Sequence, residues 1–310
     1  MILPFPSRFL GLLWVLGALV GCSKANVSDE VVDEIAQQVG DVMASMDEVG
    51  GPAGTLSQHQ NSFLKMQDSL EPHFSLPGLL PEAHAASCLI DGAFSMCSAS
   101  TRTMQRNFHN CTLGLATFNG SVSLNWSGSG SGCSLGLPSS GGSITRVPDF
   151  SVTGLRGATL HVQLAPGAVF GQKLSYVAGS GVGPNAQFKF SSDGIRRVFT
   201  LADETPLIDL TTLTSSDLTL TGSDRADAGR VRTLDGGVLK IKNNLSDFSC
   251  DFSPTQVKWT SNCNCPVSGT WQASCSDGTS STIELTGCGS AQFTFGAETQ
   301  TVSFDRCVQF

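Results

Sequence analysis

The stretch Thr233–Lys242, which reads TLDGGVLKIK, decides the fold class of this chain of 310 residues. It contains an Asp-Gly pair, Asp235-Gly236, followed by a run in which Leu239 and Ile241 alternate with lysines. Asp-Gly readily adopts the positive φ of a tight hairpin turn, and a side-chain period of two is that of a β-strand with one wet face. The stretch therefore predicts a turn followed by a strand of an antiparallel sheet.

The same two features recur from about residue 105 onward. Further Asp-Gly pairs at Asp193-Gly194 and Asp277-Gly278 fall between alternating runs and predict hairpin turns. The alternating runs include GSVSLNW (120–126), TLHVQL (159–164), AQFKF (186–190), QFTF (292–295) and TVSFD (301–305). Charged residues make up only 14% of the chain, against roughly 25% in ordinary soluble domains. We therefore expect a mainly β fold, an antiparallel meander or sandwich-like sheet with a short N-terminal helical segment.

Residues 105–310 are expected to form the β domain, either as one unit or as two sub-domains of about 105–200 and 201–310 that share a sheet. Before them, residues 28–49 predict a helix, because Ser28 can cap its start and apolar residues recur at every third or fourth position. These residues are Val31, Ile35, Val39, Val42, Met46 and Val49. The stripe allows two interpretations, packing against the chain's own sheet or a coiled-coil-like contact with a partner or second copy. A short second helix is expected around 58–70.

The first 21 residues have the parts of an export signal. Arg8 supplies a positive charge, and Phe9–Val20 is an apolar run of twelve residues. This run is too short to cross a bilayer as a helix, which needs roughly 20 residues. It ends in the sequence Leu19-Val20-Gly21-Cys22, which places a cysteine directly after a small residue.

This ending resembles the lipobox of bacterial lipoproteins. The resemblance implies removal of residues 1–21, a diacylglyceryl group on the Cys22 sulfur, and attachment of the chain to a membrane through that lipid. Residues 22–104 then form a tether and helical segment. Ser23 stands where an Asp commonly favours retention in the inner membrane of Gram-negative bacteria, so the resemblance favours the outer membrane.

Once Cys22 is set aside, ten cysteines remain, and an even count in an exported chain predicts five disulfides. They are Cys88, Cys97, Cys111, Cys133, Cys250, Cys263, Cys265, Cys275, Cys288 and Cys307. The simplest pairing is local: Cys88 with Cys97, Cys111 with Cys133, and three bridges among the last six. A thiolate metal site at Cys263 and Cys265 is the weaker alternative, because one residue separates them and no histidine is near. The stretch 250–307 is also similar in texture to cysteine-rich β domains of bacterial surface lipoproteins, which implies exposure in the envelope.

The formal charge of −8 becomes −9 when Arg8 leaves with the signal, and the one basic pair is Arg196-Arg197. Such a chain is a poor candidate for binding nucleic acid. We expect no cofactor and no metal. A membrane, through the lipid on Cys22, is the first expected partner, and an envelope protein or a glycan is the second. The oligomeric state is left open.

No sequence motif for catalysis is present, since the chain lacks G-x-S-x-G, H-E-x-x-H and a P-loop. The five histidines, His59, His73, His84, His109 and His161, are scattered. Asp217, Asp224 and Asp227 match no calcium loop and suit a solvated turn. Trp126, Trp259 and Trp271 either supply core area, which we favour, or stack on sugar rings.

These observations favour a non-enzymatic envelope lipoprotein with a structural, adhesive or binding role. The alternatives are an envelope hydrolase whose site is assembled in space, and a carbohydrate-binding module.

Overall fold

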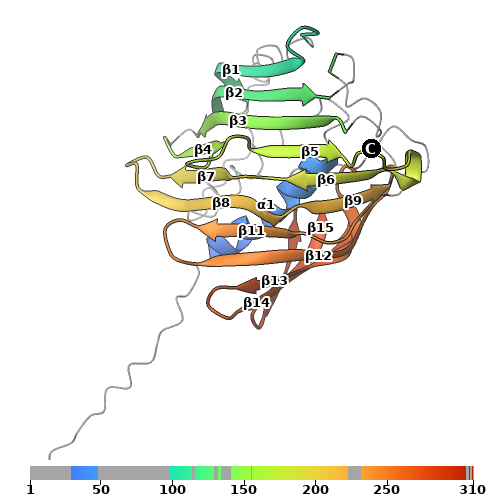
Figure 1. The fold of residues 1–310 in the computed structure, drawn as a ribbon. Helices are drawn as coiled ribbons and strands as arrows, with labels where there is room; N and C mark the ends of the chain where they lie inside the picture. Colours follow the sequence, from blue (N-terminus) through green and yellow to red (C-terminus); the bar gives the residue numbers. More distant parts are fainter. Residues whose placement is uncertain are drawn as a thin grey trace, which may run out of the picture.

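The computed structural model describes residues 29–47, 98–113, 116–128, 132–133, 141–154, 156–222, 232–304, 307 and 309. The Cys22 motif, the expected helix at 58–70, Asp224 and Asp227 lie outside these ranges. Within them the chain is mainly β, with one α-helix, α1 (Asp29–Asp47), and a single antiparallel sheet (Figure 1). The predicted fold class is therefore confirmed.

The sheet contains sixteen strands in the described part of the chain. They are β1 (Thr103–Leu113), β2 (Ala116–Ser127), β3 (Ser143–Thr153), β4 (Thr159–Leu164), β5 (Gln172–Tyr176), β6 (Gln187–Ser191), β7 (Ile195–Thr200), β8 (Pro206–Ser216), β9 (Leu218–Gly222), β10 (Arg232–Leu234), β11 (Val238–Asn243), β12 (Ser249–Trp259), β13 (Pro266–Cys275), β14 (Ser280–Gly287), β15 (Ser290–Phe295) and β16 (Glu298–Ser303). A short 3-10 helix, Gly183–Asn185, precedes β6.

Eight of these strands are laid end to end in four rows, β4–β5, β6–β7, β8–β9 and β10–β11, and the other eight are unbroken. Strand β3 pairs with β4 through Phe150–Thr153 and with β5 through Ser143–Arg146, so both halves of the row share one edge of β3. Strand β12 likewise pairs with β11 through Ser249–Phe252 and with β10 through Val257–Trp259. With each row counted once, the sheet is an up-and-down meander. Figure 1 shows β4 and β5, β6 and β7, and β8 and β9 lying one beyond the other within their rows.

The Asp-Gly pairs serve two different purposes in this sheet. Asp277-Gly278 forms the predicted hairpin between β13 and β14, where Ser274 pairs with Ser280. The prediction was wrong at Asp193-Gly194 and Asp235-Gly236, which interrupt rows instead of turning the chain back. The physical reason is that a positive φ suits a local break as well as a hairpin, and both glycines adopt it.

The carboxylates of these two pairs stabilise the breaks. Asp193 accepts the backbone N–H groups of Val169 and Phe170 at 2.6 and 3.0 Å, which fixes the excursion between β4 and β5. Asp235 accepts the N–H of Gln256 at 2.9 Å, where β12 itself is irregular and Gln256 has a positive φ of 50°. The breaks are therefore built features of the sheet.

The two regions that the sequence allowed as sub-domains share the sheet. Strand β7 ends at residue 200 and pairs directly with β8, with Phe199 opposite Ile208. One hydrophobic cluster joins buried residues from β1 to β16 and from α1.

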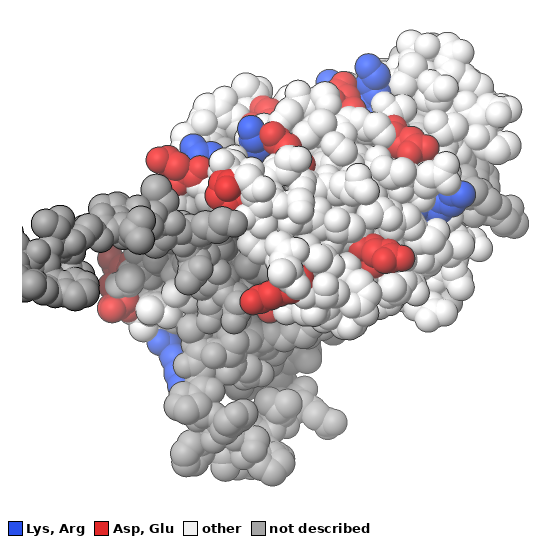
Figure 2. Space-filling view, turned by 90° about the horizontal axis from the view of Figure 1, so that it is seen from below, with Lys and Arg blue, Asp and Glu red and all other residues white. Residues whose placement is uncertain are grey.

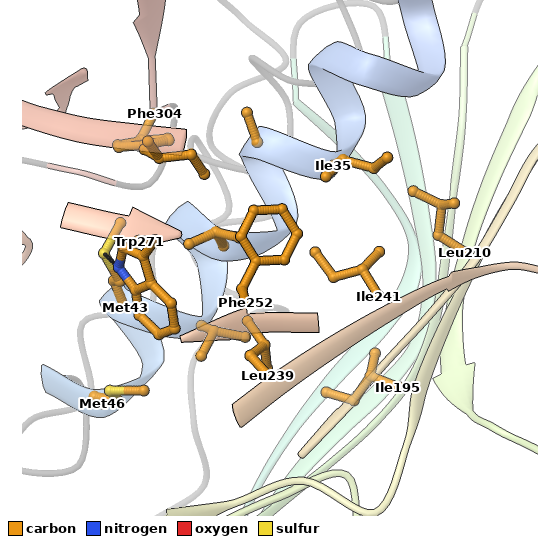
Figure 3. Packing of buried hydrophobic residues seen from close by; sticks show 14 of the residues in the cluster. Ile35, Met43, Met46, Ile195, Leu210, Leu239, Ile241, Phe252, Trp271 and Phe304 are labelled. Carbon is orange, nitrogen blue, oxygen red and sulfur yellow. Dashed lines mark hydrogen bonds between the residues drawn. The ribbon is translucent and has the colours of Figure 1, made fainter. Parts of the chain in front are cut away.

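Helix α1 lies on the concave face of this curved sheet (Figures 1 and 3). Its apolar stripe is buried, with Ile35, Val39 and Met46 each at most 1% exposed. Figure 3 shows the helix among side chains from several rows, including Phe252 and Trp271. Packing against the chain's own sheet is thus confirmed, and the coiled-coil alternative is wrong, because the stripe is already covered.

Gly40 of α1 packs against Phe304, which directly follows β16. A Cβ on Gly40 would lie 2.5 Å from Cδ1, 2.8 Å from Cγ and 3.1 Å from Cβ of Phe304. The glycine is therefore required by packing, since the helix can only reach this distance without a side chain.

Gly40→Ala should lower the free energy of unfolding by about 1–2 kcal/mol, although alanine is the better helix former by about 1 kcal/mol. The cause is overlap with the Phe304 ring, so Phe304→Leu in the same chain should restore part of the loss. Urea unfolding of the two single variants and the double variant measures this coupling. A Gly40→Ala protein as stable as the wild type would contradict the close contact.

Candidate functional site

Helix α1 carries a second stripe, made of polar residues, that is buried as deeply as the apolar one. Glu34, Gln38 and Asp41 are 5%, 2% and 6% exposed. They face Arg197 of β7, whose Nη1 lies 3.7 Å from Glu34 Oε1 and whose Nη2 pairs with the Asp41 carboxylate. Gln38 Nε2 donates to Glu34 Oε1 at 2.6 Å, and Thr212 Oγ1 of β8 donates to Gln38 Oε1 at 2.8 Å. We call these five residues the helix-docking cluster.

The end of α1 is held by a second arginine. Arg232 of β10 donates from Nη1 to the carbonyl of Met46 at 3.0 Å, and its guanidinium lies 4.9 Å from the centroid of the Phe188 ring. A cation suits the negative end of the helix dipole. On the exposed side, Gln37 Nε2 donates to the carbonyl of Ser303 at 2.8 Å. Polar contacts from β7, β8, β10 and β16 thus fix the position of the helix along the sheet.

Arg196 and Arg197 are neighbours in β7, so their side chains point to opposite faces of the sheet. Arg196 Nε and Nη2 donate to the two carboxylate oxygens of Asp209 at 2.8 and 2.5 Å. Asn244 Nδ2 donates to Asp209 Oδ1 and lies 2.8 Å from Thr211 Oγ1. The basic pair in the sequence is therefore two separate ion-pair sites.

Burial opposes ionisation of Asp209, but the hydrogen bonds from Arg196 and Asn244 outweigh it and lower the pKa of Asp209 from its ordinary value of 3.8. A lowered pKa stabilises the fold above the unfolded-state value, and the contribution is lost as pH falls through the folded-state value.

Asp209→Asn should therefore cost about 1–3 kcal/mol near neutral pH, and the difference from the wild type should shrink below about pH 4. Urea unfolding across this pH range measures both. The matched control is Asp217→Asn, since Asp217 is exposed and lies 3.9 Å from exposed Lys189. It should change stability by less than about 0.5 kcal/mol. Equal losses in the two variants would count against the network around Asp209.

The three tryptophans of the sheet region differ in burial: two are fully buried and one is partly buried. Trp259 and Trp271 are 1% and 0% exposed, so sugar stacking by these two is wrong and the core interpretation is confirmed. Trp259 Nε1 donates to the carbonyl of Asn264 at 3.2 Å, and Trp271 Nε1 lies 3.2 Å from the sulfur of Met43 on α1. Trp126, on β2, is partly buried against the core.

The last six cysteines form three disulfides, as local pairing predicts: Cys250–Cys275, Cys263–Cys288 and Cys265–Cys307. The metal interpretation of Cys263 and Cys265 is wrong, because each sulfur is bonded to a different distant cysteine. Across the described ranges, no group of three or more His, Cys, Asp or Glu side chains could hold a metal ion.

The front cysteines are only partly described. Cys111 and Cys133 are both disulfide-bonded. Cys22, Cys88 and Cys97 lie outside the described residues, and so do His59, His73 and His84.

One histidine meets a carboxylate in the described sheet. His161 Nε2 of β4 lies 3.5 Å from Asp149 Oδ1 of β3, and Ser151 is the direct cross-strand neighbour of His161. The His161 and Asp149 side chains are 41% and 75% exposed. His109 is an exposed residue of β1. Serine, histidine and aspartate thus come together on an open face of the sheet.

The outer face of β12 to β16 presents two cross-strand rows of polar side chains. The first row is Ser253, Gln272, Thr282, Thr294 and Thr299, and the second is Thr255, Thr270, Glu284, Gln292 and Thr301. All ten are exposed or half-exposed, and only Glu284 is charged. We call these ten residues the polar face. The sequence showed that the strands have hydroxyl-rich sides, but only the register shows that the polar positions are aligned across five strands.

In the described part of the chain, no helix is long and apolar enough to span a bilayer. Comparisons with protein-family models, with curated proteins and with solved structures found no match to this chain.

Proposed function

We propose that the chain is a lipid-anchored protein of the bacterial envelope that acts by binding, with a structural or adhesive role, and not by catalysis. The Cys22 motif supports the anchor, and Ser23 favours the outer membrane. The observation that carries the proposal furthest is the buried position of α1, which begins at Asp29. Only residues 23–28 separate Cys22 from this helix, a reach of at most about 25 Å.

This arrangement suits the display of a sheet close to a membrane. Because α1 is held by the helix-docking cluster and by Arg232, a force on the lipid would be transmitted directly to β7, β8 and β10. The outer face of the sheet is then available for a partner.

The anchor is tested by expressing the full chain in a bacterium that processes lipoproteins. The wild-type protein should fractionate with membranes and enter the detergent phase on phase separation. Cys22→Ser should appear in the aqueous phase, and Ser23→Asp should move the protein from the outer to the inner membrane. A wild-type protein in the aqueous phase, or a Cys22→Ser protein that stays in membranes, would overturn the proposal.

A second candidate function is a hydrolase, favoured by the juxtaposition of Ser151, His161 and Asp149. A serine nucleophile needs a base within hydrogen-bond reach and a carboxylate that orients the base. Hydrolysis of a panel of p-nitrophenyl esters tests it. Activity that is lost in both Ser151→Ala and His161→Ala would establish the hydrolase, whereas equal background rates in all three proteins would remove it.

A further inference from the structure

We infer that the polar face of β12 to β16 is a binding surface for a neutral polysaccharide. The inference rests on the proposed binding role but not on the lipid anchor. It starts from the chemistry of the ten side chains, nine of which end in a hydroxyl or an amide. Hydroxyl and amide groups both donate and accept hydrogen bonds, as do the hydroxyl groups of a sugar.

The charge of this surface selects a neutral ligand. Glu284 is the one charged group among the ten, and the chain as a whole is acidic. In Figure 2 charged groups are scattered, some of them as neighbours of opposite charge, over a surface that is mostly uncharged. An anionic polymer would be repelled, and a cationic one would find no cluster of carboxylates here.

The composition also argues against a protein as the partner. The centres of protein interfaces are enriched in aromatic residues, Met and Arg and depleted in Ser and Glu. The polar face contains no aromatic and no aliphatic residue. Five neighbouring strands are separated by four inter-strand spacings, so the polar face extends over about 19 Å across the strands. This is long enough for several sugar units.

The polar face is held rigid before any ligand binds. Thr294 Oγ1 and Thr299 Oγ1 lie 2.9 Å apart, and Gln292 Nε2 donates to Thr301 Oγ1 at 2.9 Å. At the other side of the polar face, the Cys250–Cys275 disulfide joins β12 to β13. Side chains that are already ordered lose less entropy on binding.

The chain offers a matched pair of variants for the test. Thr294 belongs to a hydrogen-bonded threonine pair in the polar face, and Thr159 belongs to a similar pair with Thr153, 3.2 Å apart, between β3 and β4. Thr294→Arg and Thr159→Arg therefore make the same chemical change on two regions of one sheet. Gln272→Arg, at an exposed position of the polar face, gives a second variant.

The experiment measures binding of the full chain, in non-ionic detergent, to insoluble cellulose, chitin and β-1,3-glucan, with alginate as the anionic comparison. The wild type should bind at least one neutral polymer, equally at low and high salt. Thr294→Arg and Gln272→Arg should bind roughly tenfold more weakly, while Thr159→Arg binds like the wild type.

Three results would overturn the inference: no binding to any neutral polymer, binding to alginate alone, or equal binding by Thr294→Arg and Thr159→Arg. Unfolding curves of all variants establish that each is folded. Because these assays use detergent-solubilised protein, they are independent of the Cys22 fractionation, and either can fail without the other.

Discussion

Replacing Arg197 with methionine should lower the free energy of unfolding by about 3–5 kcal/mol. The guanidinium forms ion pairs with Glu34 and Asp41, and all three side chains are at least nine-tenths buried. Methionine fills much of the same volume but removes the charge that both carboxylates contact from the sheet. Charges buried without a partner are far more costly than the pair itself is favourable. Urea unfolding at neutral pH measures the loss.

Arg196→Met is the matched control, because it makes the same change one residue away on the opposite face. The Arg196 side chain is 31% exposed, so solvent can compensate its partner Asp209 more readily. We expect a loss of about 1–2 kcal/mol there. The triple variant Arg197→Met, Glu34→Gln and Asp41→Asn should recover much of the stability, since the uncompensated charges are gone. A smaller loss in Arg197→Met than in Arg196→Met would contradict the helix-docking cluster.

Removing the Cys265–Cys307 disulfide by a double change to alanine should cost about 4 kcal/mol. The bridge closes a loop with a sequence separation of 42, the longest among the three described disulfides. It also fixes the segment that carries Phe304, whose N–H donates to the carbonyl of Gly289 at 2.8 Å. Loosening this segment should also loosen α1, because Phe304 packs directly on Gly40.

The comparison is the Cys250–Cys275 pair, changed to alanine in the same way. These cysteines have a sequence separation of 25 and are opposite each other in the ladder between β12 and β13. The ladder already holds these strands together, so we expect a loss of about 2–3 kcal/mol. Urea unfolding of both double variants measures which disulfide contributes more to the free energy of unfolding. A larger loss for the Cys250–Cys275 pair would contradict both the order set by loop length and the argument that the ladder already holds β12 and β13 together.

Much of the fold could be predicted because its signals are local. Alternation in runs such as TLHVQL gives the strands, and the stripe from Val31 to Met46 gives α1 and its packing. Local pairing predicts three bridges among the last six cysteines, and the described residues show them. The row breaks were missed because Asp-Gly reports a backbone conformation and not the direction the chain takes afterwards.

The polar contacts of the core could not be found in the same way. Glu34, Gln38 and Asp41 recur at the same helical spacing as the apolar stripe. From the sequence alone, polar residues in this pattern predict a solvent-exposed face of the helix. Only the fold shows that Arg197 approaches them. One signal was available, since adjacent residues in a strand point to opposite faces, so the pair Arg196-Arg197 had to place one guanidinium inside. The polar face likewise depends on register, which no single strand specifies.

The meander and the helix differ in how far along the chain their contacts reach. Each row pairs with the next row, so these contacts close short loops at small entropic cost. The partners of α1 are remote: Thr212 is 174 residues from Gln38, Arg232 is 186 from Met46, and Ser303 is 266 from Gln37. Strands β1 to β16 are thus a series of pairings between neighbouring rows, and α1, near the start of the described chain, packs against elements from β7 to β16 in one core.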